Sequence, residues 1–270
     1  MTEQLENEVK TILDYYNQRF SKNLTELPDL NKNKHFWNYI TLYQKLNESF
    51  IREFKDILNW YNISEYQKLS ESFIREFKDN VKWDYISKYQ KLSEKFIREF
   101  KDYVEWIHIS RYQKLSEEFI RKFKYKLNWF NISQYQKLSD EFWNEFKEEL
   151  GDKPKDNLLY WTNKQKLELL KQYPQYKIED GYVYAFKGIR SDRYSAYNYQ
   201  FKYEVGKIYE CHADHNLGHE DSFGLSCWTY EEAENYCNQL VIQVRFKIED
   251  LAAVVHQGGK LRVSKFEVLS

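Results

Sequence analysis

A tryptophan recurs every 23 residues over much of the first half of the chain, and this spacing constrains the fold more than any other feature. The five tryptophans are Trp37, Trp60, Trp83, Trp106 and Trp129. Counted from each Trp, position 4 is always Ile, position 7 Tyr, position 8 Gln and position 10 Leu, and positions 14 and 18 are Phe. A fixed period of this length is typical of solenoids, in which each unit buries its apolar face against its neighbours. The sequence therefore predicts an all-α solenoid of five repeats over residues 37–150.

Each repeat carries the pattern of two short helices. Positions 1, 4 and 7 are three apart, which places Trp, Ile and Tyr on one face of a first helix. Position 11 is Asn or Ser, a favoured N-cap, and an acidic residue follows it, as the helix dipole favours. Positions 14, 15, 18 and 22 then form the apolar stripe of a second helix. Because neither helix is long enough to be stable alone, we expect the tryptophans to be buried between units.

Three polar positions also recur. We expect Gln at position 8 to satisfy backbone carbonyls between units. Lys at position 9 and Arg at position 16 could together track phosphates as a basic ridge. Glu53, Glu76 and Glu99 stand beside those arginines, however, which favours solvated ion pairs instead.

The side chains that vary between repeats lie at positions 2, 3, 6 and 13, and variation with aromatic content is typical of a binding surface. Neutral drift at solvated positions is the alternative explanation. The predicted partner-binding ridge consists of Tyr61, Asn62, Glu65, Asp84, Tyr85, Lys88, Ile107, His108, Arg111, Phe130, Asn131 and Gln134.

The repeats are bounded by two different segments. Residues 1–36 lack the full pattern, but Leu5, Val9, Ile12 and Leu13 fall on one helical face, which predicts a helical cap for the first unit. Residues 151–157 contain Gly151 and Pro154 and are predicted to be a linker. The alternative is that the chain after residue 157 packs as a sixth, degenerate unit.

Residues 158–270 have a different pattern and predict a separate α+β domain with a mainly antiparallel sheet. Two helices are expected, over residues 158–173 and 229–237. The expected strands are residues 181–186, 199–203, 222–226, 240–248, 252–255 and 261–269, and residues 205–210 are expected to be a turn that leads into another strand. A domain of this size can bury its own core.

Composition narrows the partners and the compartment. The formal net charge is -1, so the bulk basic field expected of a protein that binds nucleic acid is absent. No apolar run approaches the length of a membrane span, and the polar N-terminus does not have the pattern of a signal peptide. Three cysteines do not make a disulfide framework. We expect a soluble, intracellular protein.

Two resemblances follow from specific segments. The 23-residue unit, in forms such as residues 89–101, resembles repeats of mimivirus-like giant DNA viruses of amoebae. Residues 185–189, 203–209, 223–228 and 265–269 resemble a small uncharacterised domain of phage and giant-virus proteins, often found at the C-terminus. The resemblance implies location in the host cytoplasm or the virion. It implies no activity, because neither family has an established one.

Histidines and cysteines in the second half raise the possibility of a metal site. Cys211, His212, His215 and His219 are close in sequence, with Cys227 beyond, and zinc prefers these residue types. The spacing matches no standard zinc ribbon or finger. We therefore expect no metal and no cofactor. Cys211, Cys227 or Cys237 could also serve as a nucleophile, but none lies in a catalytic motif.

A second possibility is a loose similarity to ADP-ribosyltransferases. Residues 186–189, the 222–226 strand with its following helix, and Glu267 resemble the three-part arrangement of that superfamily. Lys187 departs from the pattern, because an Arg or His would hold the dinucleotide there. A Gln/Glu-x-Glu pair is also missing before the last strand.

Two classes of function remain. The first is a non-enzymatic scaffold that binds a protein partner through the ridge, and we favour it. The alternative is an enzyme or nucleotide-binding module in residues 158–270, with the repeats as a targeting arm. A pocket of convergent polar side chains in the C-terminal domain would favour the enzyme.

Overall fold

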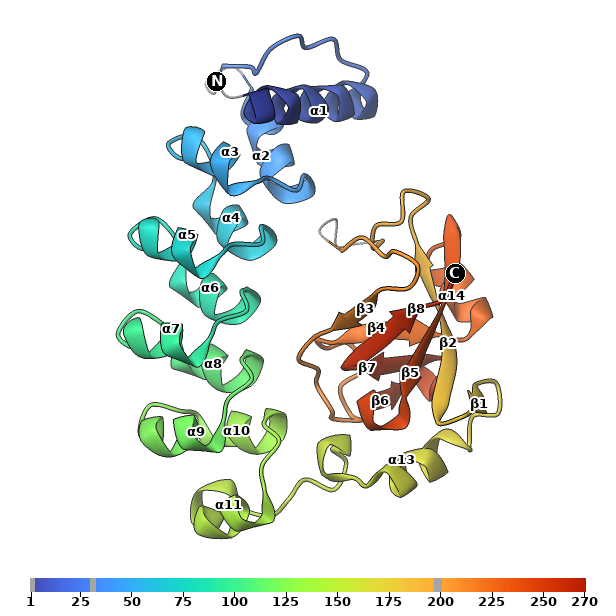
Figure 1. Cartoon of the computed structure of the whole chain (residues 1–270). Helices are drawn as coiled ribbons and strands as arrows, with labels where there is room; N and C mark the ends of the chain where they lie inside the picture. The colour runs from blue at the N-terminus through green and yellow to red at the C-terminus, as the bar shows by residue number, and fades with distance from the viewer. Residues whose placement is uncertain (1–2, 30–32, 197–200) are drawn as a thin grey trace. The chain divides into compact units, whose positions relative to one another are not determined.

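The computed structural model describes residues 3–29, 33–196 and 201–270, which form two compact units, Met1–Val104 and Glu105–Ser270 (Figure 1). The first unit is helical, and the second combines helices with a sheet. The predicted fold class, helical repeats followed by an α+β region with an antiparallel sheet, is confirmed. Within the described residues, no helix is long and apolar enough to cross a membrane.

The first unit contains a long helix followed by pairs of short helices. We number the repeats 1 to 5 from the five tryptophans. The helices of this unit are α1 (Glu3–Phe20), α2 (Lys34–Tyr43), α3 (Glu48–Glu53), α4 (Trp60–Tyr66), α5 (Glu71–Glu76), α6 (Trp83–Tyr89) and α7 (Glu94–Glu99). In each repeat the even-numbered helix is the first and the odd-numbered helix is the second. The first helices of neighbouring repeats contact one another, α2 with α4 and α4 with α6.

The second unit begins with two more repeats and continues into the sheet. Its helices are α8 (Trp106–Tyr112), α9 (Glu117–Phe123), α10 (Trp129–Tyr135), α11 (Asp140–Glu145), α12 (Lys147–Leu150), η1 (Leu158–Tyr160), α13 (Asn163–Leu170), α14 (Tyr230–Tyr236), η2 (Ile248–Asp250) and η3 (His256–Gly258). Here α8 contacts α10 as the first helices of the first unit contact one another.

The second helix of each repeat begins at the predicted N-cap. In repeat 2, the Ser70 hydroxyl accepts a hydrogen bond from the Phe73 amide, and the equivalent Asn or Ser does the same in every other repeat. The second helix is shorter than predicted: the predicted apolar stripe extends to Val81, whereas α5 ends at Glu76. Phe77 and Val81 are still buried. They belong to a separate turn after the helix, in which the Val81 amide donates to the Phe77 carbonyl.

The prediction that the tryptophans are buried between units is wrong for four of the five. Trp37 is buried, whereas the other four are half-buried. The Trp83 ring stacks on Phe96 and Phe100 of its own repeat, at 6.2 and 5.0 Å between centroids. Its indole N–H donates to the Lys78 carbonyl. Each tryptophan thus links the two helices of one repeat, while the fully buried Ile at position 4 lies between neighbours.

The glutamines at position 8 join neighbouring repeats, as predicted. The Gln90 Nε2 donates to the carbonyls of Ser64 and Gln67, at 2.9 and 2.7 Å, and its Oε1 accepts from the Leu69 amide at 3.0 Å. Gln67 and Gln136 make the same three bonds to the repeats before them. The carbonyls lie at the end of a helix, where no intrahelical partner remains. Each glutamine therefore satisfies three buried backbone groups at once.

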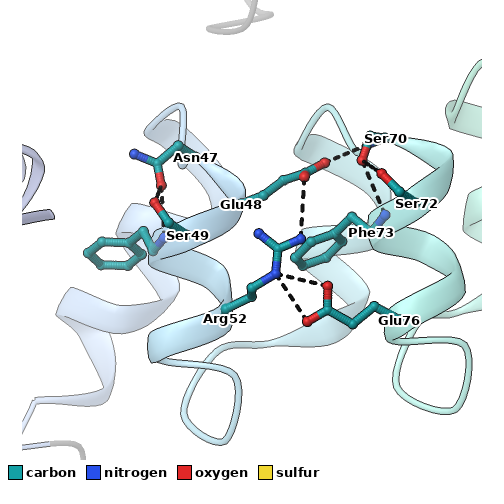
Figure 2. Close-up of polar contacts among 9 residues, drawn as sticks. Asn47, Glu48, Ser49, Arg52, Ser70, Ser72, Phe73 and Glu76 are labelled. Atoms are coloured by element: carbon teal, nitrogen blue, oxygen red, sulfur yellow. Dashed lines mark hydrogen bonds and ion pairs between the residues drawn. The ribbon is translucent and has the colours of Figure 1, made fainter. Parts of the chain in front are cut away.

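The arginines at position 16 form ion pairs, as predicted, but their partner is a glutamate of the next repeat and not the one beside them in the sequence. Arg52 pairs with Glu76 of the next repeat at 2.9 Å (Figure 2). Arg75 pairs with Glu99 in the same way, also at 2.9 Å. The Arg52 guanidinium also lies 5.0 Å from the centre of the Phe73 ring. The Glu48 carboxylate accepts from the Ser70 amide, across the same repeat interface (Figure 2). These pairs are partly exposed to solvent, which screens them, so each contributes little to the stability of the fold.

Helix α1 covers the first repeat with a matching contact. Glu8 accepts a hydrogen bond from the Asn47 amide at 2.9 Å, as Glu48 does from the Ser70 amide. Leu5, Ile12 and Leu13 are buried on the face predicted from the sequence. In the described part of residues 1–36, α1 therefore serves the role predicted for a cap; residues 1–2 and 30–32 lie outside the described residues.

The sheet is antiparallel throughout, and its described strands follow the order β3-β8-β5-β2-β4-β7-β6, with β1 added to β2. The strands are β1 (Lys177–Glu179), β2 (Tyr182–Ile189), β3 (Ile208–Glu210), β4 (Leu225–Trp228), β5 (Leu240–Lys247), β6 (Leu251–Val255), β7 (Lys260–Val263) and β8 (Lys265–Val268). Helix α14 packs closely on β2 at Gly188. A Cβ atom at this position would lie 2.0 Å from the Ala233 carbonyl oxygen, so only glycine fits there.

Three predicted elements of this domain differ in the structure. The helix expected over residues 158–173 is divided, because Thr162 and Gln165 form a capping box that starts α13 anew. The strand expected over 261–269 is divided at Ser264, whose amide bonds to the Asp250 carbonyl. Of the strand expected over 199–203, Tyr199 and Gln200 lie outside the described residues, and Lys202 forms an isolated bridge with Tyr194.

Contacts also cross the predicted linker. The Asn157 Nδ2 donates to the Gln134 carbonyl at 2.7 Å, and the Tyr160 hydroxyl donates to the Ser133 carbonyl at 2.6 Å. Leu158, between them, is fully buried in the core of the sheet. The expectation that few contacts cross residues 151–157 is therefore wrong. Whether residues 37–150 and 158–270 are independent domains stays a prediction.

Candidate functional site

Three of the four variable positions, 2, 3 and 6, lie on the first helices, whereas position 13 lies on the second. We call the residues at positions 2, 3, 6 and 7 the first-helix surface. Of the predicted ridge residues, the exposed ones are Tyr61, Asp84, Ile107 and Phe130. The half-buried ones are Asn62, Glu65, Tyr85, Lys88, His108, Arg111 and Gln134, and Asn131 is buried. No observation tests these residues as a binding site, so the ridge stays a prediction.

In the first unit this surface is rich in tyrosine. Tyr61 contacts Tyr85 edge to face at 5.9 Å, and Tyr85 stacks on Tyr89 at 6.0 Å. Tyr61 is 55% exposed, Tyr89 44% and Tyr66 38%, so large parts of these rings face solvent. Exposed aromatic rings with a polar hydroxyl are typical of protein-binding surfaces.

Two ridge residues have structural hydrogen bonds instead. The Asn62 Nδ2 donates to the Thr41 hydroxyl at 3.1 Å, and the Asn131 Nδ2 donates to the Ile107 carbonyl at 3.0 Å. Both bonds join neighbouring repeats. Asn62 and Asn131 therefore stabilise the repeats, whatever else they contact.

In the second unit, the first-helix surface already holds an aromatic side chain of the same chain. Phe223 precedes β4, and its ring lies 5.0 Å from the Tyr112 ring and 5.6 Å from the Tyr135 ring. These tyrosines stand at position 7 of repeats 4 and 5. Tyr135 is only 3% exposed beside Phe223.

Arg111 and His212 complete this contact. The Arg111 guanidinium lies 5.2 Å from the centre of the Tyr112 ring, 4.9 Å from Tyr135 and 5.9 Å from Phe223. His212 stacks on Phe223 at 5.4 Å, and its Nε2 lies 3.2 Å from the Arg111 carbonyl oxygen. Burial is the main reason that the pKa of His212 is lowered, which favours a neutral ring here.

The two residue types that define this contact are not among the predicted site residues. The tyrosines at position 7 are invariant, and their spacing predicts the packed face of the first helix, together with Trp and Ile. An invariant residue is equally compatible with a core and with a repeated surface. For Phe223 the sequence held no signal, because its contact with Tyr112 joins residues far apart in the chain.

The structure does not bring the predicted histidines and cysteines together. His219 bonds to Asp214 at 2.7 Å, whereas His212 faces Arg111. Cys227 lies in the sheet core. In the part of the chain that the structure describes, no three His, Cys, Asp or Glu side chains are placed to hold a metal ion.

Two of the three thiols are kept in the neutral form by burial. Burial raises the pKa of Cys211 to about 11 and that of Cys227 to about 12, so both thiols are protonated at neutral pH. Cys237 lies close to the Ile189 carbonyl, at 3.2 Å from its oxygen.

The residues that resembled an ADP-ribosyltransferase site are engaged elsewhere. Lys187 is buried, donates to the Ser226 carbonyl at 2.8 Å and lies about 5 Å from the Tyr203 and Trp228 rings. Burial lowers the pKa of Lys187 to about 8. Glu267 is bound by Arg245 at 2.8 Å.

Comparisons with known proteins found no matching family model, no matching curated protein and no matching solved structure. The resemblances to giant-virus repeats and to a phage and giant-virus domain therefore stay predictions.

Proposed function

We propose that this protein is a non-enzymatic scaffold that binds a protein partner through the first-helix surface of its repeats. The observation that carries the proposal is the row of partly exposed tyrosines on the first unit, Tyr61, Tyr66, Tyr85 and Tyr89. Tyrosine supplies a large contact area at small entropic cost, since it has few rotatable bonds. Such rings are enriched at protein interfaces.

The packing of Phe223 supports the same function. It is an example, within this chain, of a first-helix surface receiving a side chain from another part of a protein. The surface therefore has the shape and chemistry for such a contact. The side chains of this surface carry charges of both signs, with Glu65 and Asp84 negative and Lys88 positive. Such a surface is compatible with a protein partner.

The proposal is tested by quantitative affinity purification of the full chain from the cells that express it. The variant Tyr61→Ala/Tyr85→Ala/Tyr89→Ala removes the exposed rings. The matched control is Tyr125→Ala, because Tyr125 is 91% exposed but lies in the turn after α9. A partner that is retained by the wild type and by the control, and lost by the triple variant, supports the scaffold function. Equal recovery with all three chains refutes the role of this surface.

A further inference from the structure

The contact between Phe223 and the repeats has a geometry that other repeats can form. It needs two tyrosines at position 7 of consecutive repeats and one position-6 side chain beside them. In the second unit these residues are Tyr112, Tyr135 and Arg111. In the first unit, the residues at the same positions of repeats 2 and 3 are Tyr66, Tyr89 and Glu65.

The two tyrosine pairs stand on the same backbone framework. Gln136 joins repeats 4 and 5 through bonds of 3.0, 2.8 and 3.0 Å to Ser110, Gln113 and Leu115. Gln90 joins repeats 2 and 3 through bonds of 2.9, 2.7 and 3.0 Å to the equivalent groups. Since the glutamine immediately follows the tyrosine in each repeat, these bonds fix the relative placement of the two tyrosines.

The difference between the pairs is their exposure. Tyr135, beside Phe223, is 3% exposed, whereas Tyr66 is 38% and Tyr89 is 44% exposed. Tyr66 and Tyr89 thus present the surface that Phe223 covers in the second unit.

We propose that Tyr66 and Tyr89 bind an aromatic side chain of a protein partner, in the way that Tyr112 and Tyr135 bind Phe223. This inference rests on the proposed function and names the group that the surface recognises. The occupant is a partner protein and not a second copy of this chain, because the Phe223 of each copy is already engaged by its own Tyr112 and Tyr135.

The position-6 residue specifies the neighbours of that aromatic group. Glu65 stands where the second unit has Arg111, and the Lys88 ammonium lies 4.6 Å from the centre of the Tyr89 ring, so a negative charge replaces a positive one on the Tyr66 side of the pair only. Burial, and then the nearby Glu65 carboxylate, raise the pKa of Tyr66. Burial is also the main reason that the pKa of Tyr89 is raised, while Lys88 lowers it and Glu65 raises it. The negative charge thus lies close to both rings. We expect the partner to carry Lys or Arg next to its aromatic residue.

The experiment selects displayed random peptides on the full-length protein and measures their affinities by fluorescence anisotropy. We expect selected peptides to pair Phe, Tyr or Trp with a neighbouring Lys or Arg. Replacing the peptide's aromatic residue by Ala, or using the protein variant Tyr66→Ala/Tyr89→Ala, should each weaken binding by about tenfold or more. Tyr125→Ala should leave the affinity unchanged.

A second variant keeps the test valid if the double alanine variant folds poorly. Glu65→Arg retains both rings and places a positive charge where the second unit has Arg111. It should shift the selected peptides from basic to acidic residues next to the same aromatic group. An unchanged preference would refute the role of Glu65.

The possible outcomes separate this inference from the proposed function. Peptides that require Tyr66 and Tyr89 but no aromatic residue would overturn the inference and leave the scaffold function standing. Peptides that bind equally well to every variant would count against both. Analytical sedimentation of the full chain tests whether a second copy of this chain is the occupant instead. A dimer that is lost in both Phe223→Ala and Tyr66→Ala/Tyr89→Ala would show that Phe223 of a second copy fills the pair, and this result would also overturn the inference.

Discussion

The glutamine ladder can be tested at Gln90, whose replacement by Leu keeps the volume of the side chain and removes its hydrogen bonds. Three backbone groups would lose their partner, namely the Ser64 and Gln67 carbonyls and the Leu69 amide. Gln90 is 6% exposed, so water has little access to these groups. At about 1 kcal/mol or more for each unsatisfied group, the free energy of unfolding should fall by about 3–5 kcal/mol.

Two measurements are suited to this change. Urea denaturation followed by circular dichroism should show an earlier transition for Gln90→Leu, with the loss concentrated in repeats 2 and 3 because stability in repeat proteins is a nearest-neighbour property. Native-state hydrogen exchange adds a local readout, since the Leu69 amide loses its acceptor directly. Its protection should fall more than that of amides inside α5.

The matched control is Gln134→Leu. Gln134 is half-buried, and its side chain makes one long hydrogen bond, at 3.4 Å, to Ser133. Its replacement should change stability by less than about 0.5 kcal/mol. If Gln90→Leu unfolds at the same urea concentration as Gln134→Leu, the glutamine ladder does not stabilise the repeats as argued here.

Three further predictions follow from other contacts. Trp83→Ala should lower the free energy of unfolding by about 2–3 kcal/mol, below the range for a fully buried Trp because the ring is half-buried; chemical denaturation measures this, and a loss above about 5 kcal/mol would contradict it. Tyr160→Phe should lower the free energy of unfolding by about 1–2 kcal/mol, because the Ser133 and Gln136 carbonyls lose their donor. The same variant should be cleaved faster by trypsin after Lys155, and unchanged cleavage would contradict the role of this contact. Burial lowers the pKa of His215 to about 3, so the unfolded chain binds a proton below pH 6.5 that the folded chain does not, and stability falls as the pH falls. Between pH 6.5 and 5 this effect should reach about 2 kcal/mol, and a His215→Leu variant with the same pH dependence as the wild type would disprove it.

The repeat architecture could be predicted in detail because the same residue types recur at the same positions in five copies of the unit. The N-caps, the glutamine bonds and the arginine pairs each recur at a fixed position, and the chemistry of one residue type then defines the contact. Recurrence at a fixed position also explains why the burial of the tryptophans between repeats is predicted wrongly. Periodicity identifies a position that the fold requires, but a ring such as Trp83 meets that requirement within one repeat as well as between two.

The sheet domain was less predictable because it occurs once. Its strands were recognisable from alternation, but the interruptions depend on contacts made elsewhere in the fold, such as that of Ser264 with Asp250. The division at Thr162 was readable, since Thr followed three residues later by Gln is the pattern of a capping box. Phe223 could not be placed, because its partners are brought near by the packing of two elements with no common pattern.

The junction after the last repeat shows how far the repeat register extends. Asn157 bonds to the Gln134 carbonyl, at position 6 of repeat 5, which lies two residues before the position-8 carbonyl that a repeat glutamine binds, as Gln67 binds that of Gln44. The Tyr160 hydroxyl then donates to the Ser133 and Gln136 carbonyls, which correspond to the two carbonyls bound by each repeat glutamine. Residues 157–160 therefore continue the polar contacts of a repeat without its helices. Since Leu158 of the same short segment is buried in the sheet core, this stretch of four residues belongs to both structures. Loosening Tyr160 should then weaken the last repeat and the sheet together, which two domains joined by a free linker would not do.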